Sequence, residues 1–280
     1  METKRRPDIV YKYFPPERFT FFFKPLVRFT PLSELNDPFE GRTVFGTVSL
    51  NLDEFKQKGE LFIRRAFGAK NRHPSEIESV VDKFKLSPQE VFEAINQFLM
   101  PAASVVSRSM FDNKGLAVFS LSLMANHELM WSHYAKDHKG FAIGFDCSHP
   151  FFDHEQQTGK YSVFGSKPVM YLSERPQISM LEAEEQQIPL YMGLFTKSRA
   201  WEYEQEWRVI ISEVEKINKF GVIGLVEMPL EAIKEVRIGF KAAPQVEANA
   251  KNFCREYDIS LLHGELHPQK WELMFEEVAL

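Results

Sequence analysis

The sequence predicts an α+β fold, in which a mixed, mostly antiparallel sheet has flanking helices and a helical insertion. Strand-like segments gather toward both ends of the chain, whereas residues 52–110 have a helical pattern. Strands and helices do not alternate regularly, as they would in a doubly wound fold. No linker rich in Gly, Ser or Pro divides the chain. We therefore expect a single domain over residues 1–280, with residues 52–110 as a helical insertion or lid.

The N-terminal part predicts two strands followed by helices. Phe19–Phe23 and Leu26–Thr30 are aromatic and apolar segments that favour strands. Asn36-Asp37-Pro38 predicts a turn, because Pro disfavours the helical region for the residue before it. Leu52–Phe67 and Ser75–Phe84 have the apolar spacing of helices.

The C-terminal part returns to strands. Ala117–Leu123 predicts a strand, and Asn126 is a suitable N-cap for a helix that runs to Lys139 and stops at Gly140. The further elements expected are strands at Phe141–Asp146, Val169–Leu172, Trp207–Ile211, Gly221–Glu227, Val236–Gly239 and Ile259–Leu262, and an amphipathic helix over 245–257.

Composition excludes several classes of protein. A formal net charge of −5 gives no overall attraction to nucleic acid or to anionic membranes. The two cysteines are too few for a disulfide framework or a thiolate zinc site. We see no signal peptide and no apolar run that could span a bilayer, so we expect a cytoplasmic protein. The 26 phenylalanines predict a core packed largely by aromatic rings.

The first polar segment runs from Arg28 to Glu40. Arg28 and Thr30 lie two apart on the expected strand and share a face. An arginine at a sheet edge can hold a phosphate or a carboxylate through two parallel hydrogen bonds. The alternative is a structural turn, in which Asp37 caps its own backbone and Arg28 pairs with a nearby acid.

The second segment joins Ser120-Leu121-Ser122 to an aromatic helix. Trp131, Tyr134 and His138 would share one helical face, and each needs a polar partner when buried. Such a stripe can be either core or a ligand platform. His133 and His138 lack the i, i+4 spacing of a helical zinc motif, so we expect no metal here.

The third segment contains Lys197 and ends in Glu204-Gln205-Glu206-Trp207-Arg208. If this approach is extended, Glu204, Glu206 and Arg208 point to one side. Carboxylates beside an arginine can do acid–base or electrostatic work on a substrate. The alternative is a cross-strand salt bridge on an edge strand, which contributes little.

Together these segments resemble a widespread prokaryotic family described only as domain of unknown function 2971. The matching pieces are Arg28-Phe29-Thr30-Pro31, Asn36-Asp37-Pro38-Phe39-Glu40, Ser120-Leu121-Ser122, Met130-Trp131-Ser132-His133-Tyr134-Ala135, His138-Lys139-Gly140-Phe141, and Lys197 with Trp201, Tyr203-Glu204 and Glu206-Trp207-Arg208. The resemblance covers roughly residues 10–240, and it implies no particular activity.

The order of these motifs is also similar to that of the ADP-ribosyltransferase fold. That resemblance implies NAD as a substrate, an arginine on the first strand that holds it, a pocket lined by Ser-x-Ser, a stacking aromatic residue and a catalytic glutamate. Carried over, it gives Glu206, Glu204 and Tyr134 as catalytic residues, and Arg28, Thr30, Ser120, Ser122, Trp131, His133, Lys197 and Arg208 as cofactor-binding residues.

Three functional hypotheses remain open. The first is an ADP-ribosyltransferase-like enzyme, such as a toxin or phage-defence effector, that modifies a protein or a nucleic acid. The second is a non-catalytic module that binds an anionic ligand, nucleic acid or protein partner through Arg28, Lys197 and Arg208. The third is a metal-dependent nuclease using Asp37, Glu40 and Asp146.

Overall fold

The computed structural model describes residues 5–37, 39–40, 48–49, 51–68, 72–97, 115–152, 163–174, 178–179 and 193–280. The chain divides into two compact units. The first comprises Met1–Leu35, Lys114–Tyr171 and Arg199–Leu280, and the second comprises Asn36–Asn113 and Leu172–Ser198. That the whole chain acts as a single domain stays a prediction.

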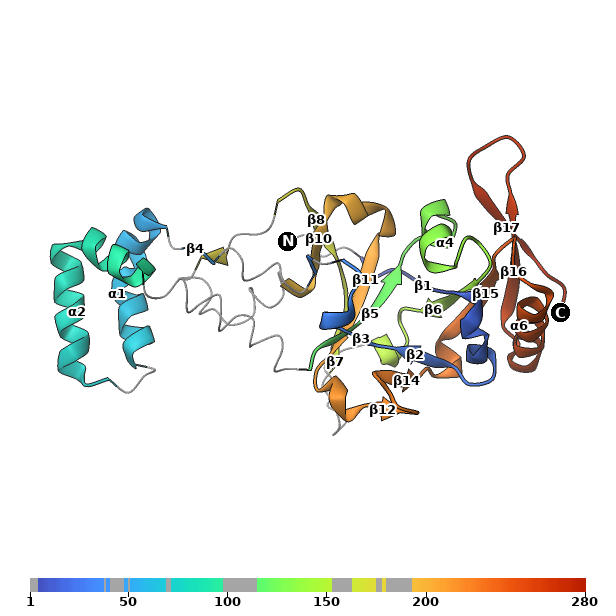
Figure 1. Cartoon of the computed structure of the whole chain (residues 1–280), viewed down its shortest axis with the longest axis horizontal. Coiled ribbons are helices and arrows are strands. Elements are labelled where there is room, and N and C mark those ends of the chain that lie inside the picture. Colours follow the sequence, from blue (N-terminus) through green and yellow to red (C-terminus); the bar gives the residue numbers. More distant parts are fainter. Residues whose placement is uncertain are drawn as a thin grey trace. The chain divides into compact units, whose positions relative to one another are not determined.

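The first unit is built on an open sheet with the strand order β17-β16-β15-β6-β1-β5-β11-β7, in which β3 also pairs with β5 (Figure 1). Its strands are β1 (Ile9–Phe14), β3 (Thr30–Pro31), β5 (Ala117–Ser122), β6 (Phe141–Asp146), β7 (Val163–Pro168), β11 (Glu206–Ile211), β15 (Ile233–Ile238), β16 (Ser260–Leu266) and β17 (Leu273–Glu277). Among these strands β15 and β16 pair in parallel, and the other pairings are antiparallel. The predicted α+β class with a mixed, mostly antiparallel sheet is confirmed.

Strand β1 lies in the middle of this sheet, between β5 and β6. The sequence Ile-Val-Tyr-Lys-Tyr-Phe lacks a simple alternation of apolar and polar residues, because most of its side chains on both faces are buried. Val10 and Phe14 pack on one face, and Tyr11 and Tyr13 pack on the other. Sequence reasoning missed this strand, and the sheet is organised around it.

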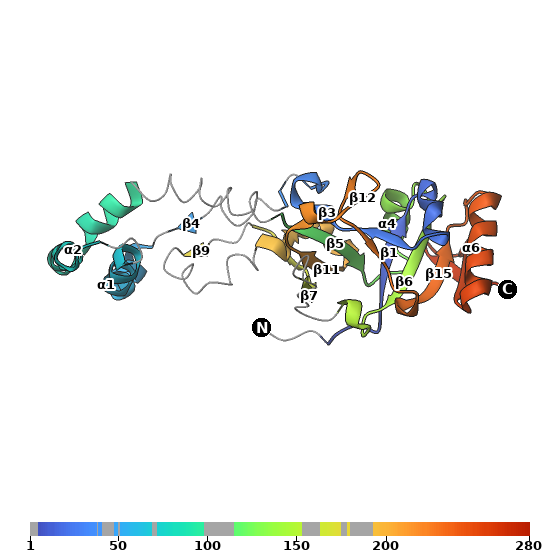
Figure 2. The same ribbon diagram turned by 90° about the horizontal axis from the view of Figure 1, so that it is seen from below.

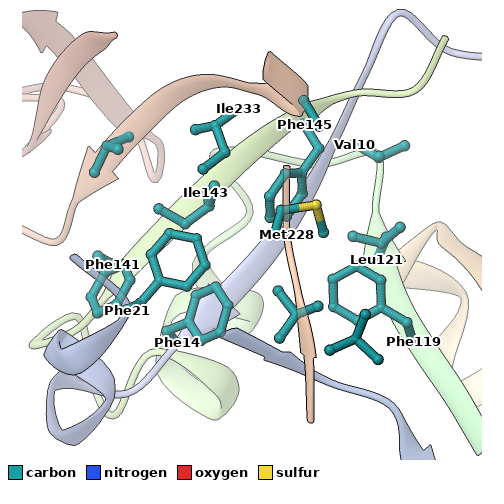
Figure 3. Packing of buried hydrophobic residues seen from close by; sticks show 14 of the residues in the cluster. Val10, Phe14, Phe21, Phe119, Leu121, Phe141, Ile143, Phe145, Met228 and Ile233 are labelled. Atoms are coloured by element: carbon teal, nitrogen blue, oxygen red, sulfur yellow. The ribbon is translucent and has the colours of Figure 1, made fainter. Parts of the chain in front are cut away.

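One face of the sheet carries a large apolar cluster (Figure 3). Its aromatic members include Phe22, whose ring centroid lies 4.6 Å from that of Phe141 and 5.7 Å from that of Phe253. Phe253 belongs to helix α6 (Pro244–Tyr257), which packs beside β15 (Figure 2). The prediction of a core packed by aromatic rings is confirmed here.

The opposite face is covered by helix α4 (Glu128–Tyr134). Trp131 of this helix is fully buried and meets Tyr13 of β1 edge-on, with ring centroids 5.3 Å apart. The prediction that the helix continues to Lys139 is wrong. Residues 136–138 have φ angles of 48°, 55° and 66°, and this left-handed turn ends the helix before β6.

The predicted strand Phe19–Phe23 is also wrong. These residues form most of a 3-10 helix, η1 (Pro16–Phe22), with Pro at its first position. Proline suits the start of a helix, because its fixed φ is helical and its missing N–H would have no partner there. Phe21 and Phe22 still reach the core, so the apolar signal was correct and the assigned geometry was not.

The predicted strand Leu26–Thr30 is split in two. Its first part, β2 (Leu26–Arg28), pairs with β14 (Leu225–Glu227) in a separate ribbon, and only β3 joins the main sheet. Gly224, at φ 80°, divides the expected strand Gly221–Glu227 into β13 (Val222–Ile223) and β14. A Cβ there would lie 2.1 Å from the carbonyl oxygen of Phe29, so glycine permits this close approach.

Short elements complete the first unit. They are β8 (Met170–Leu172, which runs one residue beyond it), β12 (Asn218–Lys219), β13 (Val222–Ile223), and the 3-10 helices η2 (Leu32–Glu34), η3 (Pro150–Phe152), η4 (Arg199–Glu204), η5 (Val214–Lys216) and η6 (Leu230–Ala232). Within the described residues, no helix has the length and apolarity needed to cross a membrane.

The second unit contains helices α1 (Leu52–Gly68) and α2 (Pro74–Leu86), and residues 88–97 are also helical. Their own apolar cluster holds Phe55 and Phe84, whose rings meet edge-on at Gly59. Strands β4 (Val48–Ser49) and β9 (Ile178–Ser179) pair in parallel, and β10 spans Thr196–Ser198. The helices predicted at 52–67 and 75–84 are confirmed, while residues 98–110 of the expected insertion lie outside the described residues.

Gly140 offers a test of how tightly β1 and β6 are joined. A Cβ at this position would lie 2.0 Å from the carbonyl oxygen of Phe14. We expect Gly140→Ala to lower the free energy of unfolding by about 1–3 kcal/mol, because backbone would have to move. Urea denaturation measures this. Gly68→Ala is the control, since a Cβ there would meet no described atom within 4 Å beyond its chain neighbours and its own helix backbone, and a loss of equal size would contradict the explanation.

Candidate functional site

The central strands bring several of the predicted site residues to one face of the sheet. Register pairs Glu206 of β11 with Ser122 of β5, and Ser122 with Tyr11 of β1. Arg208 is likewise paired with Ser120. Their neighbours along the strands, such as Trp207 and Leu121, belong to the apolar cluster on the other face.

Glu206 and Arg208 form a two-pronged ion pair within β11. Arg208 donates from Nε to Oε1 of Glu206 at 2.7 Å and from Nη2 to Oε2 at 2.8 Å. The two residues are only 4% and 1% exposed, so both charges have been removed from water. The two parallel hydrogen bonds compensate part of that desolvation. The prediction that Glu206 and Arg208 share one side is confirmed.

Glu204 lies at the end of the turn that leads into β11. It belongs to η4, and Gln205 after it has φ 42°, so the extended approach considered for this segment is wrong. The Glu204 side chain is nevertheless buried, and Tyr134 of α4 donates its hydroxyl to Oε1 at 2.5 Å. The turn therefore directs Glu204 toward α4, while Glu206 remains on the strand.

Ser122 fixes this turn to the end of β5. Its hydroxyl donates to the backbone carbonyl of Glu204 at 2.6 Å and accepts from the backbone N–H of Met124 at 3.0 Å. The backbone N–H of Glu206 donates to the Tyr171 hydroxyl at 2.7 Å. The cluster is therefore held by hydrogen bonds that run between strands, turn and helix. We call Ser122, Tyr134, Glu204, Glu206 and Arg208 the polar cluster.

Aromatic rings surround the Glu204 turn. Tyr203 stacks on His127, with ring centroids 5.4 Å apart and planes at 26°. Exposed His133 lies 6.3 Å from the same Tyr203 ring. Trp131, by contrast, is a core residue. Its Nε1 donates to the carbonyl of Ala125 at 3.0 Å, which supplies the polar partner that a buried indole needs.

Two predicted residues have no hydrogen bond or pairing to the polar cluster among their described contacts. Arg28 lies on the β2–β14 ribbon, where it donates to Glu34 at 2.6 Å and to the carbonyl of Ile223 at 3.4 Å. Thr30 of β3 pairs with Val118. This arrangement corresponds to the alternative predicted from the sequence, in which Arg28 pairs with a nearby acid.

Lys197 belongs to the second unit, together with Asp37 and Glu40. Its ammonium lies 3.3 Å from Oε1 of Glu40, and both side chains are buried. Asp37 accepts from the backbone N–H of Phe39 at 2.8 Å, as expected for a turn that caps its own backbone. The other carboxylate oxygen of Asp37 is buried and has no hydrogen-bond partner within the part of the chain that the structure describes.

Tyr11 is the residue of this face that sequence reasoning missed. Its register row continues from Ser122 through Gly144 of β6 to Glu235 of β15. Burial raises the pKa of Tyr11 to about 12, and the neighbouring Arg237 opposes the increase. The segment Ile9–Phe14 could have been recognised as a strand buried on both faces, because five of its six side chains are aromatic or β-branched.

The described residues contain no group of three or more His, Cys, Asp or Glu side chains arranged to hold a metal ion. Asp146, one of the acids of the nuclease hypothesis, accepts from the hydroxyl of Ser148 at 2.6 Å and lies 3.1 Å from Lys234. These contacts, with the Ser148 hydroxyl as the largest cause, lower the pKa of Asp146. The Asp146 carboxylate is thus engaged by Ser148 in the following turn and by Lys234 of β15.

The fold and this cluster define an α+β protein with a buried Tyr–Glu contact beside a Glu–Arg pair, at the centre of an open sheet. Residues 130–209 match the family model described as protein of unknown function (DUF2971), which confirms the resemblance to that family over a segment containing the polar cluster from Tyr134 to Arg208. Searches of curated proteins and of solved structures gave no match.

The buried Glu206–Arg208 pair predicts a large asymmetry between single and double substitutions. Arg208→Met leaves the Glu206 carboxylate buried without its partner, and we expect the free energy of unfolding to fall by about 3–5 kcal/mol. The double variant Glu206→Leu with Arg208→Met removes both charges and should recover part of that loss. A double-mutant cycle by urea denaturation measures the coupling, and additive effects would contradict it.

Proposed function

We propose that this protein is an NAD-using enzyme of the ADP-ribosyltransferase type, with its chemistry at the polar cluster. The strand order β11-β5-β1 is the observation that carries the proposal. It gives a Glu-bearing strand, a Ser-x-Ser strand and a first strand side by side, with Glu206 and Ser122 in register. The tyrosine of the aromatic helix contacts the Glu-x-Glu segment directly, through Tyr134 and Glu204.

Glu206 is the proposed catalytic carboxylate. When the bond between ribose and nicotinamide breaks, positive charge develops on the ribose, and nicotinamide leaves with the bonding electron pair. A fixed carboxylate next to that charge stabilises the transition state, and it does so more strongly in a site from which water is excluded. The burial of Glu206 supports this part of the proposal.

Arg208 is the proposed positioning residue for Glu206. Its two hydrogen bonds fix the orientation of the Glu206 carboxylate. Tyr134 positions Glu204 in the same way, because its hydroxyl donates a hydrogen bond to the Glu204 carboxylate. In this proposal Glu204 and Tyr134 shape the nicotinamide end of the site, with Ser120 and His133 as binding residues around it, while the fully buried Trp131 supports the site from the core and does not contact NAD.

The first-strand position belongs to Tyr11 in this proposal, rather than to Arg28 or Thr30. Tyr11 is in register with Ser122, on the strand next to the Ser-x-Ser strand. Arg28 is engaged by Glu34 on a separate ribbon. Lys197 stays a proposed NAD-binding residue on the motif order alone. The proposed acceptor is a macromolecule, either protein or nucleic acid, as for a toxin or phage-defence effector.

A second candidate is the non-catalytic binding module. The observation that favours it is the full engagement of Glu206, since both carboxylate oxygens accept hydrogen bonds from Arg208. A carboxylate whose charge is already compensated is less able to stabilise a developing cation. In this candidate the ion pair is structural, and the surrounding aromatic side chains contact the partner.

Nicotinamide release from NAD by the purified chain tests the proposal. We expect Glu206→Gln to lower the release rate by about 100-fold or more, because it removes the negative charge that stabilises the transition state. Tyr134→Phe removes one hydroxyl and should lower the rate with little effect on folding. Glu231→Gln, at an exposed position, is the control.

The outcomes separate the two candidates. Release that depends on Glu206 and Tyr134, in variants that still show a cooperative urea transition and are therefore folded in the assay, supports the enzyme. NAD binding without release, followed by release on adding cell extract as a source of acceptor, also supports it. If the purified chain neither releases nicotinamide nor binds NAD in calorimetry, the enzyme proposal is overturned in favour of the binding module.

A further inference from the structure

A pocket of about 390 Å³ lies on the first unit, away from the polar cluster in its lining residues. It is formed where the loop between β16 and β17 faces the start of α4 and the left-handed turn that follows α4. Its lining includes Glu128, His138, Leu266, Lys270, Trp271 and Glu272. Its volume is within the range of small-molecule sites.

Trp271 is the first sign that this pocket has an occupant. The side chain is 97% exposed, although a tryptophan gains more than most residues from burial. It stands on the loop that joins β16 and β17, and Figure 1 shows this loop projecting beyond the edge of the sheet. Leu266, at the start of the same loop, is 60% exposed. An indole held out in this way beside a pocket can close over a ligand.

His138 is the second sign. Its Nδ1 is buried and has no hydrogen-bond partner among the described residues, while Nε2 lies 3.4 Å from the hydroxyl of Ser132. The ring is parallel to Trp131, at 6°, and also packs on Phe240. Burial, with Lys241 as a smaller cause, lowers the pKa of His138, which favours the neutral ring with one nitrogen free to accept.

The backbone conformation around His138 is also energetically unfavourable. Lys136, Asp137 and His138 have consecutive left-handed φ angles, although none of them is a glycine. Such conformations persist only where the surrounding structure enforces them. Here the carbonyl of His138 accepts from the backbone N–H of Lys241 at 3.0 Å, which ties the turn to the segment after β15. The strained turn keeps the imidazole fixed against the pocket.

The remaining polar groups determine the class of ligand. Glu128 and Glu272 supply carboxylates, which only accept hydrogen bonds, and His138 adds an acceptor nitrogen. Trp271 supplies an aromatic face, which attracts a cation. Lys270 is 63% exposed and lies 3.9 Å from Glu272, so its charge is screened by water. A pocket rich in acceptors, with one open indole, suits a planar cation with many donors.

We propose that this pocket binds a guanidinium group, with its face on Trp271 and its N–H groups directed to Glu128, Glu272 and His138. The group comes either from a small molecule or from an arginine side chain of a protein partner, and the chemistry is the same for both. This proposal does not depend on the NAD chemistry proposed above, because it uses none of the residues of the polar cluster.

Calorimetric titration of the full chain tests this with matched probes. Agmatine represents the small molecule, and a capped Gly-Arg-Gly peptide represents the protein side chain. A capped Gly-citrulline-Gly peptide has the same shape without the charge. We expect the arginine peptide or agmatine to bind, and citrulline to bind about tenfold more weakly or worse, because the charge-assisted hydrogen bonds are lost.

Substitutions locate the binding. Trp271→Ala should weaken binding by about tenfold, and Trp271→Phe by less, since it keeps an aromatic face. Glu128→Gln should also weaken binding by about tenfold. Phe220→Ala removes another exposed ring, 77% exposed on the β12–β13 turn, and should leave binding unchanged. Trp271, Glu128 and Phe220 are all exposed, so these substitutions leave the core unchanged.

Tighter binding of the peptide than of agmatine identifies a protein partner as the source, and the reverse identifies a small molecule. Either result supports the proposal. Equal affinity for the arginine and citrulline peptides, full affinity in Trp271→Ala, or no heat from either arginine probe at millimolar concentration would overturn it. Tighter binding of adenosine than of both arginine probes would overturn it in favour of a nucleoside site.

Discussion

The register of strand β1 is the constraint on which the rest of the first unit depends. This strand is buried on both faces, between β5 and β6, and it carries apolar residues to one side and tyrosines to the other. A slip of one residue would move Tyr11 and Tyr13 into the apolar cluster and expose Val10 and Phe14 to the polar face. The pairing of Tyr11 with Ser122, and of Ser122 with Glu206, holds only in the observed register.

A buried ion pair is a demanding feature to place in such a sheet. Glu206 and Arg208 must each lose their hydration, and the Coulombic attraction between them compensates only in good geometry. The cluster meets this condition with two short, parallel hydrogen bonds between neighbouring positions of one face of β11. Replacing both residues by apolar ones would be a simpler way to build a core. The burial of this ion pair is therefore weak evidence for a contribution to stability.

Sequence patterns predicted the parts of this structure that have a clear period or a local cap. Phe141–Asp146 alternates cleanly and forms β6 with those bounds, and the helix predicted over 245–257 corresponds to α6. They failed where tertiary context decides the geometry. Ile9–Phe14 has no period because both faces are buried, and Phe19–Phe23 is rich in strand-forming residues but follows two prolines that start a 3-10 helix. In the site, the spacing of Glu206 and Arg208 was sufficient to predict a shared face, whereas the contact between Tyr134 and Glu204 joins residues 70 positions apart.

The left-handed turn after α4 connects the polar cluster with the pocket beside the β16–β17 loop. It ends the helix that presents Tyr134 to Glu204, and its last residue, His138, then lines the pocket below the β16–β17 loop. A helix continued to Lys139 would have taken His138 out of its stack against Trp131 and away from Phe240. The strain of three left-handed residues is compensated by this packing and by the hydrogen bond to Lys241. One local conformation therefore sets the length of the helix that supports the polar cluster and the position of the ring that faces the pocket.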